Sequence, residues 1–239
     1  KIDWAENQAH KHEVIDGLPA FIQGLMDSTN VDVLFGRGTL ADAHTVMVNG
    51  EAKTADKIVI STGLRPHRLT IPGSDLAHDS EDFLNLTDMP ERLTIIGGGY
   101  IAMEFATMAN AAGSDVTVIL RGKEALKAYH QPFVEQIIAD LEKHGVTFIR
   151  ETAVEAIVQG AEGLVVRGQD LNIETDWVLD ATGRVPNVEN LGLEEVGVNY
   201  TPAGITVDDY LRTSVSNIYA SGDVIDKVQP KLTPTAVFE

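Results

Sequence analysis

A glycine-rich segment between two apolar runs carries the clearest chemical signal in this 239-residue sequence. Residues 92–96 are typical of a buried strand, and Gly97, Gly99 and Ala102 follow at the spacing Gly-x-Gly-x-x-Ala before a helical pattern. Gly97 permits a tight turn, Gly99 leaves room for a pyrophosphate beside the backbone, and Ala102 lets the helix pack closely. The N–H groups and dipole at the helix N-terminus favour negative charge. The segment predicts a dinucleotide site, with a purely structural glycine turn as the alternative.

The end of the next expected strand, 115–120, bears on which dinucleotide would bind. An Asp or Glu at this point would bind the adenine ribose hydroxyls and favour NAD. The sequence instead has Leu120, then Arg121 and Lys123, with Lys127 further on. Cations in this place suit a 2′-phosphate. We therefore expect NADPH, with NADH possible, and the alternative is that these cations form a solvated basic face.

The elements that would position these residues alternate between strand and helix from residue 92 onward. Helices are expected at 101–112 and 132–144, because Gly113 and Gly145 are typical C-terminal signals. Further strands are expected at 146–150, 154–158, 163–167 and 176–181. The pattern predicts a parallel sheet with crossover helices, followed by an antiparallel meander.

The first part of the chain has weaker patterns. Apolar residues at helical spacing predict a helix over the first thirty residues. Short β-type runs follow at 31–35, 45–48 and 57–60, and Asn49-Gly50 predicts a hairpin between the last two. Gly36-Arg37-Gly38 has no helical pattern behind it and is interpreted as a loop.

Composition excludes several classes of function. The net charge of −18 argues against nucleic-acid binding, and no apolar run approaches the roughly 18 residues of a membrane span. The start of the chain resembles neither a signal nor a transit peptide. A cytoplasmic location is the default expectation. The chain has no cysteine, which excludes thiolate chemistry within it. We expect no metal site, because the histidines lack ligand spacing: His10, His12, His44, His67, His78, His130 and His144.

Five motifs in order resemble the pyridine nucleotide–disulfide oxidoreductases, a family that includes glutathione reductase, mercuric reductase and dihydrolipoamide dehydrogenase. Gly-Tyr-Ile-Ala-x-Glu at 99–104 is similar to the second dinucleotide motif of that family. Ser-Thr-Gly at 61–63 and Ala-Thr-Gly-Arg at 181–184 resemble its two crossings out of the flavin domain. The segment 216–223, ending in Gly-Asp, and Leu-Thr-Pro-x-Ala at 232–236 resemble its flavin-binding segments. The resemblance covers essentially the whole chain.

The resemblance implies roles for residues outside the glycine turn. Gly183 lies in the second crossing motif and Gly222 in the Gly-Asp motif. Asp223 would accept a hydrogen bond from a ribityl hydroxyl of FAD, while Thr233 and Ala236 would approach the isoalloxazine ring.

Two further residues would act where the hydride is transferred. Tyr100 would cover the flavin face that the nicotinamide enters, and Glu104 would lie near the nicotinamide carboxamide or a neighbouring lysine. A surface aromatic and a helix-face charge are the respective alternatives.

The chain lacks parts that the family needs. Its 239 residues contain neither the first Gly-x-Gly-x-x-Gly turn for FAD, nor the redox cysteine pair, nor the dimerisation domain with its catalytic His-Glu pair. We therefore expect a central fragment of a homodimeric flavoenzyme that passes a hydride from NADPH to FAD and electrons to a disulfide or related acceptor. Alternatively, the chain as it stands is only an NAD(P)H-binding module, inactive by itself.

The expected fold is α/β. A Rossmann-like NAD(P)-binding domain, with a parallel sheet and a β-meander, would occupy residues 84–207. Two helices would cover one face of its sheet and the meander the other. Residues 1–83 and 208–239 would form an incomplete FAD-binding domain.

Overall fold

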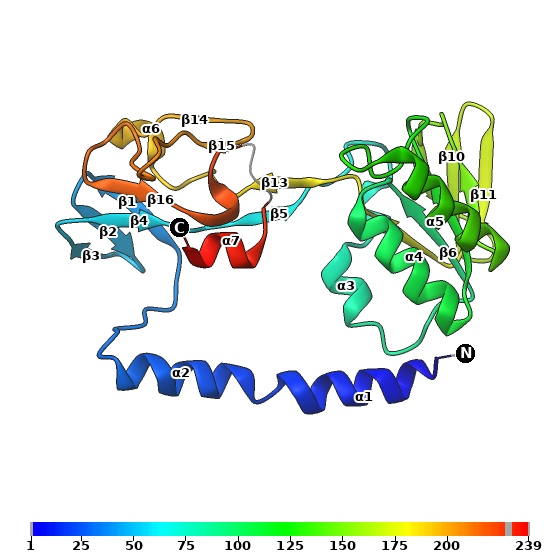
Figure 1. Cartoon of the computed structure of the whole chain (residues 1–239), viewed down its shortest axis with the longest axis horizontal. Helices are drawn as coiled ribbons and strands as arrows, with labels where there is room; N and C mark the ends of the chain where they lie inside the picture. The colour runs from blue at the N-terminus through cyan, green and yellow to red at the C-terminus, as the bar shows by residue number, and fades with distance from the viewer. Residues whose placement is uncertain (1, 228–230, 239) are drawn as a thin grey trace. The chain divides into compact units, whose positions relative to one another are not determined.

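The computed structural model describes residues 2–227 and 231–238, and among these the side chains of residues 233, 234 and 238 are not described. The chain divides into two compact units (Figure 1). The first unit contains residues 1–21 and 66–183, and the second contains residues 22–65 and 184–239.

The first unit is built on a four-stranded parallel sheet. Its strand order is β12 (Trp177–Asp180), β6 (Arg92–Ile96), β7 (Asp115–Ile119) and β8 (Thr147–Ile149). The last residues of these strands are in register, since Asp180 pairs with Ile96, Ile96 with Ile119, and Ile119 with Ile149. The carboxyl ends of all four strands therefore share one edge of the sheet.

Alternating apolar residues give the sheet two buried faces. Leu93 and Ile95 pack in one core with α4 (Tyr100–Ala112) and α5 (Gln131–Lys143). Ile96 packs in a second core with the antiparallel strands β9 (Ala156–Gln159), β10 (Leu164–Gly168) and β11 (Leu171–Thr175). The predicted arrangement, with two helices on one face and a meander on the other, is confirmed.

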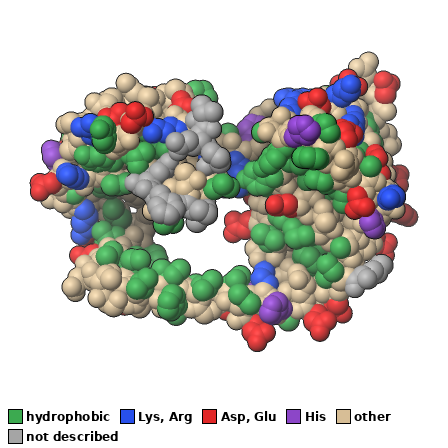
Figure 2. Space-filling view, viewed as in Figure 1, with side chains coloured by type: hydrophobic (Ala, Val, Ile, Leu, Met, Phe, Trp, Pro, Cys, Tyr) green, Lys and Arg blue, Asp and Glu red, His purple; other side chains and the backbone are tan. Residues whose placement is uncertain are grey.

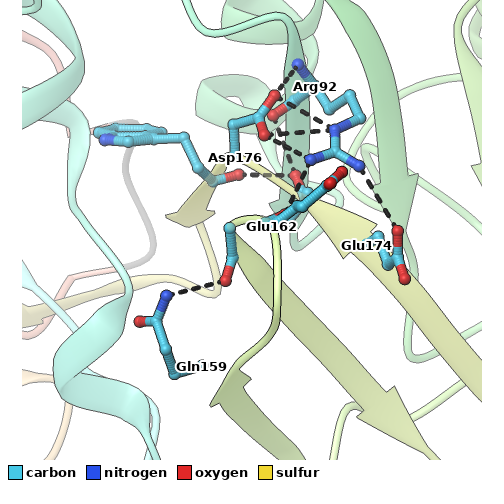
Figure 3. A network of polar contacts seen from close by, with 8 residues as sticks. Arg92, Gln159, Glu162, Glu174 and Asp176 are labelled. Atoms are coloured by element: carbon cyan, nitrogen blue, oxygen red, sulfur yellow. Dashed lines mark hydrogen bonds and ion pairs between the residues drawn. The ribbon is translucent and has the colours of Figure 1, made fainter.

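The amino edge of the sheet is closed by an ion-pair network around Arg92 (Figure 3). The Arg92 Nη2 donates to Oδ1 of Asp176 at 2.6 Å and to the Glu162 carbonyl at 3.0 Å. The Arg92 backbone N–H donates to Oδ2 of Asp176 at 2.9 Å, and Glu174 lies 3.7 Å from Nη1. This network ties β6 to the turns that precede β10 and β12.

The N-terminal segment is helical, but it forms two helices rather than one. The helix α1 (Trp4–Ile15) begins where the Asp3 side chain accepts the Glu6 N–H, and it ends before Gly17. The apolar side chains of α2 (Leu18–Ser28) lie at the surface and form a green row along this helix in Figure 2. The apolar periodicity thus correctly predicted helical structure in this segment, although the apolar residues of α2 are not buried.

An aromatic cluster anchors the two ends of the first unit's chain to its core. Phe83 of α3 (Ser80–Leu84) is fully buried and stacks on Phe105 of α4 with ring centroids 4.5 Å apart. Trp4 and Trp177 lie against the same ring at 5.7 and 6.0 Å. A short 3-10 helix, η1 (Ser74–Leu76), precedes α3.

The second unit combines short β-ladders with short helices. Strands β1 (Gly38–Asp42), β2 (Thr45–Val48) and β3 (Glu51–Thr54) form an antiparallel sheet, whereas β4 (Ile58–Ile60) pairs in parallel with β16 (Ile218–Ala220). Its remaining elements are α6 (Leu193–Val196), β14 (Tyr200–Thr201), β15 (Gly204–Ile205), η2 (Gly222–Val224) and α7 (Thr233–Phe238). Its core contains Leu40, Ile58, Ile60, Val188, Leu193, Val198, Ile205, Ile218, Ala220, Val224 and Ile225.

The units differ from the expected domain boundaries of 84 and 207. The chain passes between them at β5 (Leu64–Pro66) and β13 (Arg184–Pro186), which pair with each other. Residues 66–83 belong to the first unit because His78 pairs with β12. The His78 N–H donates to the Val178 carbonyl, and the His78 carbonyl accepts from the Asp180 N–H. Residues 184–207 belong to the second unit because their apolar side chains fill its core.

Two strand predictions need correction. Residues 31–35 form no strand, and their apolar side chains are exposed. The Asn49-Gly50 turn joins β2 to β3 rather than to residues 57–60, because a two-residue turn pairs the strands that directly flank it. The strand β11 was not predicted at all.

Candidate functional site

The glycine turn lies at the carboxyl edge of the parallel sheet, between β6 and α4. Gly97 has a φ of +131°, and a side chain there would collide with the Ala181 carbonyl. Its N–H donates to the Ile119 carbonyl at 3.0 Å. Gly97 is therefore required by the tight turn at the end of β6, as the sequence predicted, because the backbone there passes close to Ala181.

Gly99 serves a different purpose, because nothing in the protein requires it to lack a side chain. It is the N-cap of α4 with extended backbone angles, φ −82° and ψ −178°, which any residue adopts. A Cβ at Gly99 would meet no described atom within 4 Å. The space beside it is open, at a helix N-terminus whose first N–H groups have no partner within the helix. Ala102, one turn on, is fully buried.

The site can therefore accommodate a pyrophosphate, since an open approach to main-chain N–H groups is what such a group requires. Tyr100 and Glu104 lie on the same helix, four residues apart. The Tyr100 side chain is 53% exposed, and Glu104 is exposed as well. Both residues are therefore accessible to a ligand from solvent.

The loop after β7 carries the predicted cations. Leu120 is buried, while Arg121, Lys123 and Lys127 are exposed and make no ion pair in the part of the chain that is described. Glu124 lies in the same loop and is exposed too. The loop thus presents three basic groups and one acidic group to solvent.

Residues that the sequence did not single out hold this loop in place. The Leu126 N–H donates to the Gly98 carbonyl at 2.7 Å. The Gln131 side-chain amide, at the start of α5, donates to the carbonyls of Ala125, Leu126 and Tyr129 at 3.4, 3.3 and 3.1 Å. No motif marks Gln131, because its role depends on where the loop folds back.

A buried carboxylate lies at the carboxyl edge of β12. Asp180 is 5% exposed and accepts hydrogen bonds from the Leu69 N–H at 2.8 Å and from the Thr182 hydroxyl at 2.6 Å. The Gly183 carbonyl accepts the His67 N–H at 3.0 Å. Gly183 therefore lies in the segment that fixes where the chain enters and leaves the first unit.

In the second unit, the Ser-Thr-Gly and Gly-Asp motifs lie side by side. They follow the parallel strands β4 and β16, and the Ser61 and Ser221 hydroxyl oxygens are 2.9 Å apart. A Cβ at Gly222 would contact the Ala236 methyl group at 3.5 Å. No described residue hydrogen-bonds the Asp223 carboxylate, which leaves it available to a hydroxyl group. The side chain of Thr233 lies outside the described residues.

Lys231 is a residue of this region that sequence reasoning missed. Its Nζ donates to the carbonyls of Asp223 at 2.7 Å, Ile225 at 3.0 Å and Ala203 at 3.3 Å. The ammonium group thereby stabilises the turn that presents Asp223. No spacing signal identifies such a lysine, since its partners are main-chain atoms.

The described residues lack both a candidate metal site and a candidate membrane span. They contain no group of three or more His, Cys, Asp or Glu side chains placed to hold a metal ion. No helix in the described ranges is long and apolar enough to cross a membrane.

A parallel sheet with a glycine turn at its carboxyl edge, followed directly by a helix, is the architecture of the dinucleotide-binding α/β proteins. Comparison with known protein families identifies which dinucleotide-binding family this is. The chain belongs to the pyridine nucleotide-disulphide oxidoreductase family, whose model matches residues 2–239. The resemblance inferred from the five motifs is confirmed.

Individual relatives agree with this assignment. The chain is 36% identical over 242 residues to the chloroplastic/mitochondrial glutathione reductase of Pisum sativum, covering 100% of this chain and 44% of that protein. It is 40% identical to a glutathione reductase of Nostoc sp., covering 90% of this chain and 49% of the relative. It is 34% identical to the dihydrolipoyl dehydrogenase of Geobacillus stearothermophilus, covering 100% of this chain and 52% of that protein.

A solved structure supports the fold. The HOCl-induced flavoprotein disulfide reductase RclA of Escherichia coli superimposes with a TM-score of 0.93 at 30% identity, covering 99% of this chain and 55% of that one. The chain spans about half the length of the relatives it matches.

Proposed function

We propose that the first unit binds NADPH across the turn 97–102, and that the whole protein is a FAD-dependent NAD(P)H:disulfide oxidoreductase. The observation that carries this proposal is Gly99. Its backbone angles suit any residue and its Cβ position is empty, so folding does not explain the glycine. A ligand that approaches the backbone does explain it.

The residues around the turn divide the binding between them. The N–H groups at the start of α4 would hold the pyrophosphate, and Arg121 and Lys123 would meet the 2′-phosphate of NADPH. Tyr100 and Glu104 would border the nicotinamide. When bound, the nicotinamide supplies a hydride, and FAD accepts it.

The second unit would contribute part of the FAD site. Asp223 would accept a hydrogen bond from a ribityl hydroxyl, and the segment with Gly222, Thr233 and Ala236 would lie beside the isoalloxazine ring. The support is the open Asp223 carboxylate and the close approach of Gly222 to Ala236.

The proposed electron acceptor of the whole protein is a disulfide or a related group. Relatives with the printed names glutathione reductase, dihydrolipoyl dehydrogenase and flavoprotein disulfide reductase support that class. A homodimeric whole protein acting in the cytoplasm is part of the same proposal, and it rests on the family resemblance. Any reactive thiol must come from outside these 239 residues, which contain no cysteine.

Titration calorimetry of the purified chain with NADPH and with NADH tests the binding proposal. We expect one saturable site per chain, with tighter binding of NADPH because only NADPH offers a 2′-phosphate to the cations. Equal affinities would contradict the assignment of Arg121 and Lys123, and absence of binding would contradict the site itself.

A second candidate function is that this chain alone is a non-catalytic NAD(P)H-binding module. The observation that favours it is the absence from the sequence of a second Gly-x-Gly-x-x-Gly turn for the FAD pyrophosphate. Without that anion site, a few hydrogen bonds of about 0.5–1.5 kcal/mol each must offset several kcal/mol lost on immobilising FAD. We expect the purified chain to lack flavin absorbance and disulfide reductase activity. A near-stoichiometric flavin band would contradict this second candidate.

A further inference from the structure

Arg150 follows β8 directly, at the carboxyl edge of the parallel sheet. Its guanidinium group forms a bidentate ion pair with Glu135 of α5, with Nη1–Oε1 at 2.9 Å and Nη2–Oε2 at 3.0 Å. Nη1 also donates to the backbone carbonyl of Lys123 at 3.2 Å. The side chain of Arg150 therefore joins helix α5 to the loop that carries the candidate cations.

The Arg150 contact lies in a part of the loop that has few other supports. Main-chain hydrogen bonds extend the β7–β8 pairing through Leu120 and Gly122, whose carbonyls accept from Thr152 at 3.0 Å and Glu151 at 3.1 Å. Further along, Leu126 is attached to Gly98. Between these two attachments, the Lys123 carbonyl is held by Arg150. The backbone from which Arg121 and Lys123 project is thus fixed on either side of Gly122.

The charges around Arg150 are arranged so that the ion pair remains ionised. The hydrogen bond from Arg150 holds the pKa of Glu135 below its ordinary range, and the positive charge of Lys123 adds to this effect. The same hydrogen bond raises the pKa of Arg150. Glu135 neutralises Arg150, whereas Arg121 and Lys123 have no ion-pair partner among the described residues. Arg150 is therefore suited to hold the loop rather than to bind a phosphate.

We propose that Arg150, oriented by Glu135, is a positioning residue that determines cofactor choice by fixing the loop that presents Arg121 and Lys123 to a 2′-phosphate. This inference rests on the proposed binding of NADPH by the first unit. Loss of Arg150 should weaken the binding of NADPH much more than the binding of NADH, because only NADPH has a 2′-phosphate for the cations on this loop.

The test is titration calorimetry of the full chain with both cofactors, applied to the wild type and to Arg150→Met. We expect the NADPH dissociation constant to rise about tenfold, the equivalent of one hydrogen bond, with a change in NADH below about threefold. Arg150→Lys keeps the charge but not the planar fork. The Arg150→Lys variant should lose part of the preference for NADPH over NADH. If Arg150→Met does not fold, Arg150→Lys provides the test of the proposal.

A matched control exists at the opposite edge of the same sheet. Arg92 also forms a bidentate pair with the Asp176 carboxylate and donates to the carbonyl of Glu162 (Figure 3). Arg92→Met should leave both dissociation constants unchanged, whatever it does to stability. A purely structural role for Arg150 would make the two variants behave alike.

The outcomes separate this inference from the proposed function. If the wild type prefers NADPH and the Arg150 variants keep the same NADPH-to-NADH ratio, the positioning role is wrong while the binding site stands. If the variants weaken both cofactors equally, the role in selection is also wrong. If the wild type binds both cofactors without preferring NADPH, the assignment of Arg121 and Lys123 and this inference both fail, while the dinucleotide site itself stands.

Discussion

The backbone N–H of Leu126 donates to the carbonyl of Gly98 at 2.7 Å, which fastens the loop after β7 to the glycine turn. Gly98 contributes to the same junction, since a Cβ there would lie 2.6 Å from Cδ2 of Leu120. The segment proposed to hold the pyrophosphate and the segment proposed to hold the adenine ribose are therefore joined through their backbones. Such a site is organised before its ligand arrives, which lowers the entropic cost of binding.

Replacing both Arg121 and Lys123 with serine should reduce the affinity for NADPH and leave that for NADH almost unchanged. Charge-assisted hydrogen bonds to the 2′-phosphate would be lost, so we expect a drop of about ten- to a hundredfold. Titration calorimetry measures both values. Lys143→Ser, which removes an exposed cation at the end of α5, is the control and should change neither. An unchanged NADPH affinity in the double variant would show that the cations form only a solvated basic face.

Phe83→Ala should destabilise the first unit by about 3–5 kcal/mol, because it empties the centre of a fully buried aromatic cluster. Urea unfolding followed by tryptophan fluorescence suits this test, since both tryptophans of the chain lie against Phe83. Leu84→Ala is the control, because Leu84 is 44% exposed on the same helix. A similar loss of stability in both variants would contradict the packing described for Phe83.

The ion pair between Arg92 and Asp176 should make the stability of the first unit depend on pH. The hydrogen bond from Arg92 lowers the pKa of Asp176 below its ordinary value of 3.8. A carboxyl group whose pKa is lower in the folded state stabilises that state above its unfolded pKa, and the contribution is lost as the pH falls through the folded value. The stability advantage of the wild type over Asp176→Asn should thus be complete above about pH 5 and shrink below 3.8. Chemical unfolding of both proteins across this range measures it, and an advantage independent of pH would contradict the ion-pair account.

The parallel sheet could be predicted because its residues face two different cores. Leu93 and Ile95 alternate with Thr94 and Ile96, and all four are buried, so the run is apolar except for Thr94 and ends abruptly at the glycines. Strand β3 carries the opposite pattern. All four of its residues, Glu51–Thr54, are exposed, and only the Asn49-Gly50 turn indicates where the strand must pair.

The candidate site was predictable where main-chain geometry demands particular residue types. Gly97 and Ala102 could be identified because the turn and the buried helix face exclude larger side chains. Gly99 could be identified only from its place in the motif, since the protein leaves the space at its Cβ open. Arg150 and Gln131 could not, because their side chains bind carbonyl groups that folding brings to them. Carbonyl groups are common to all residues, so such contacts leave no pattern in the sequence.

The most direct test of the central claim, that the dinucleotide phosphates lie at the turn 97–102, is the affinity of Gly99→Val for NADPH. A Cβ at Gly99 meets nothing within 4 Å and its backbone angles suit any residue, so the variant should fold with an almost unchanged melting temperature. Its branched side chain would fill the space of the pyrophosphate, so calorimetric titration should detect no NADPH binding. Gly97→Val is the contrasting variant and should fail to fold normally, because its side chain would collide with the Ala181 carbonyl. If Gly99→Val bound NADPH with the wild-type affinity, the phosphates would have to lie elsewhere and the proposed site would be wrong.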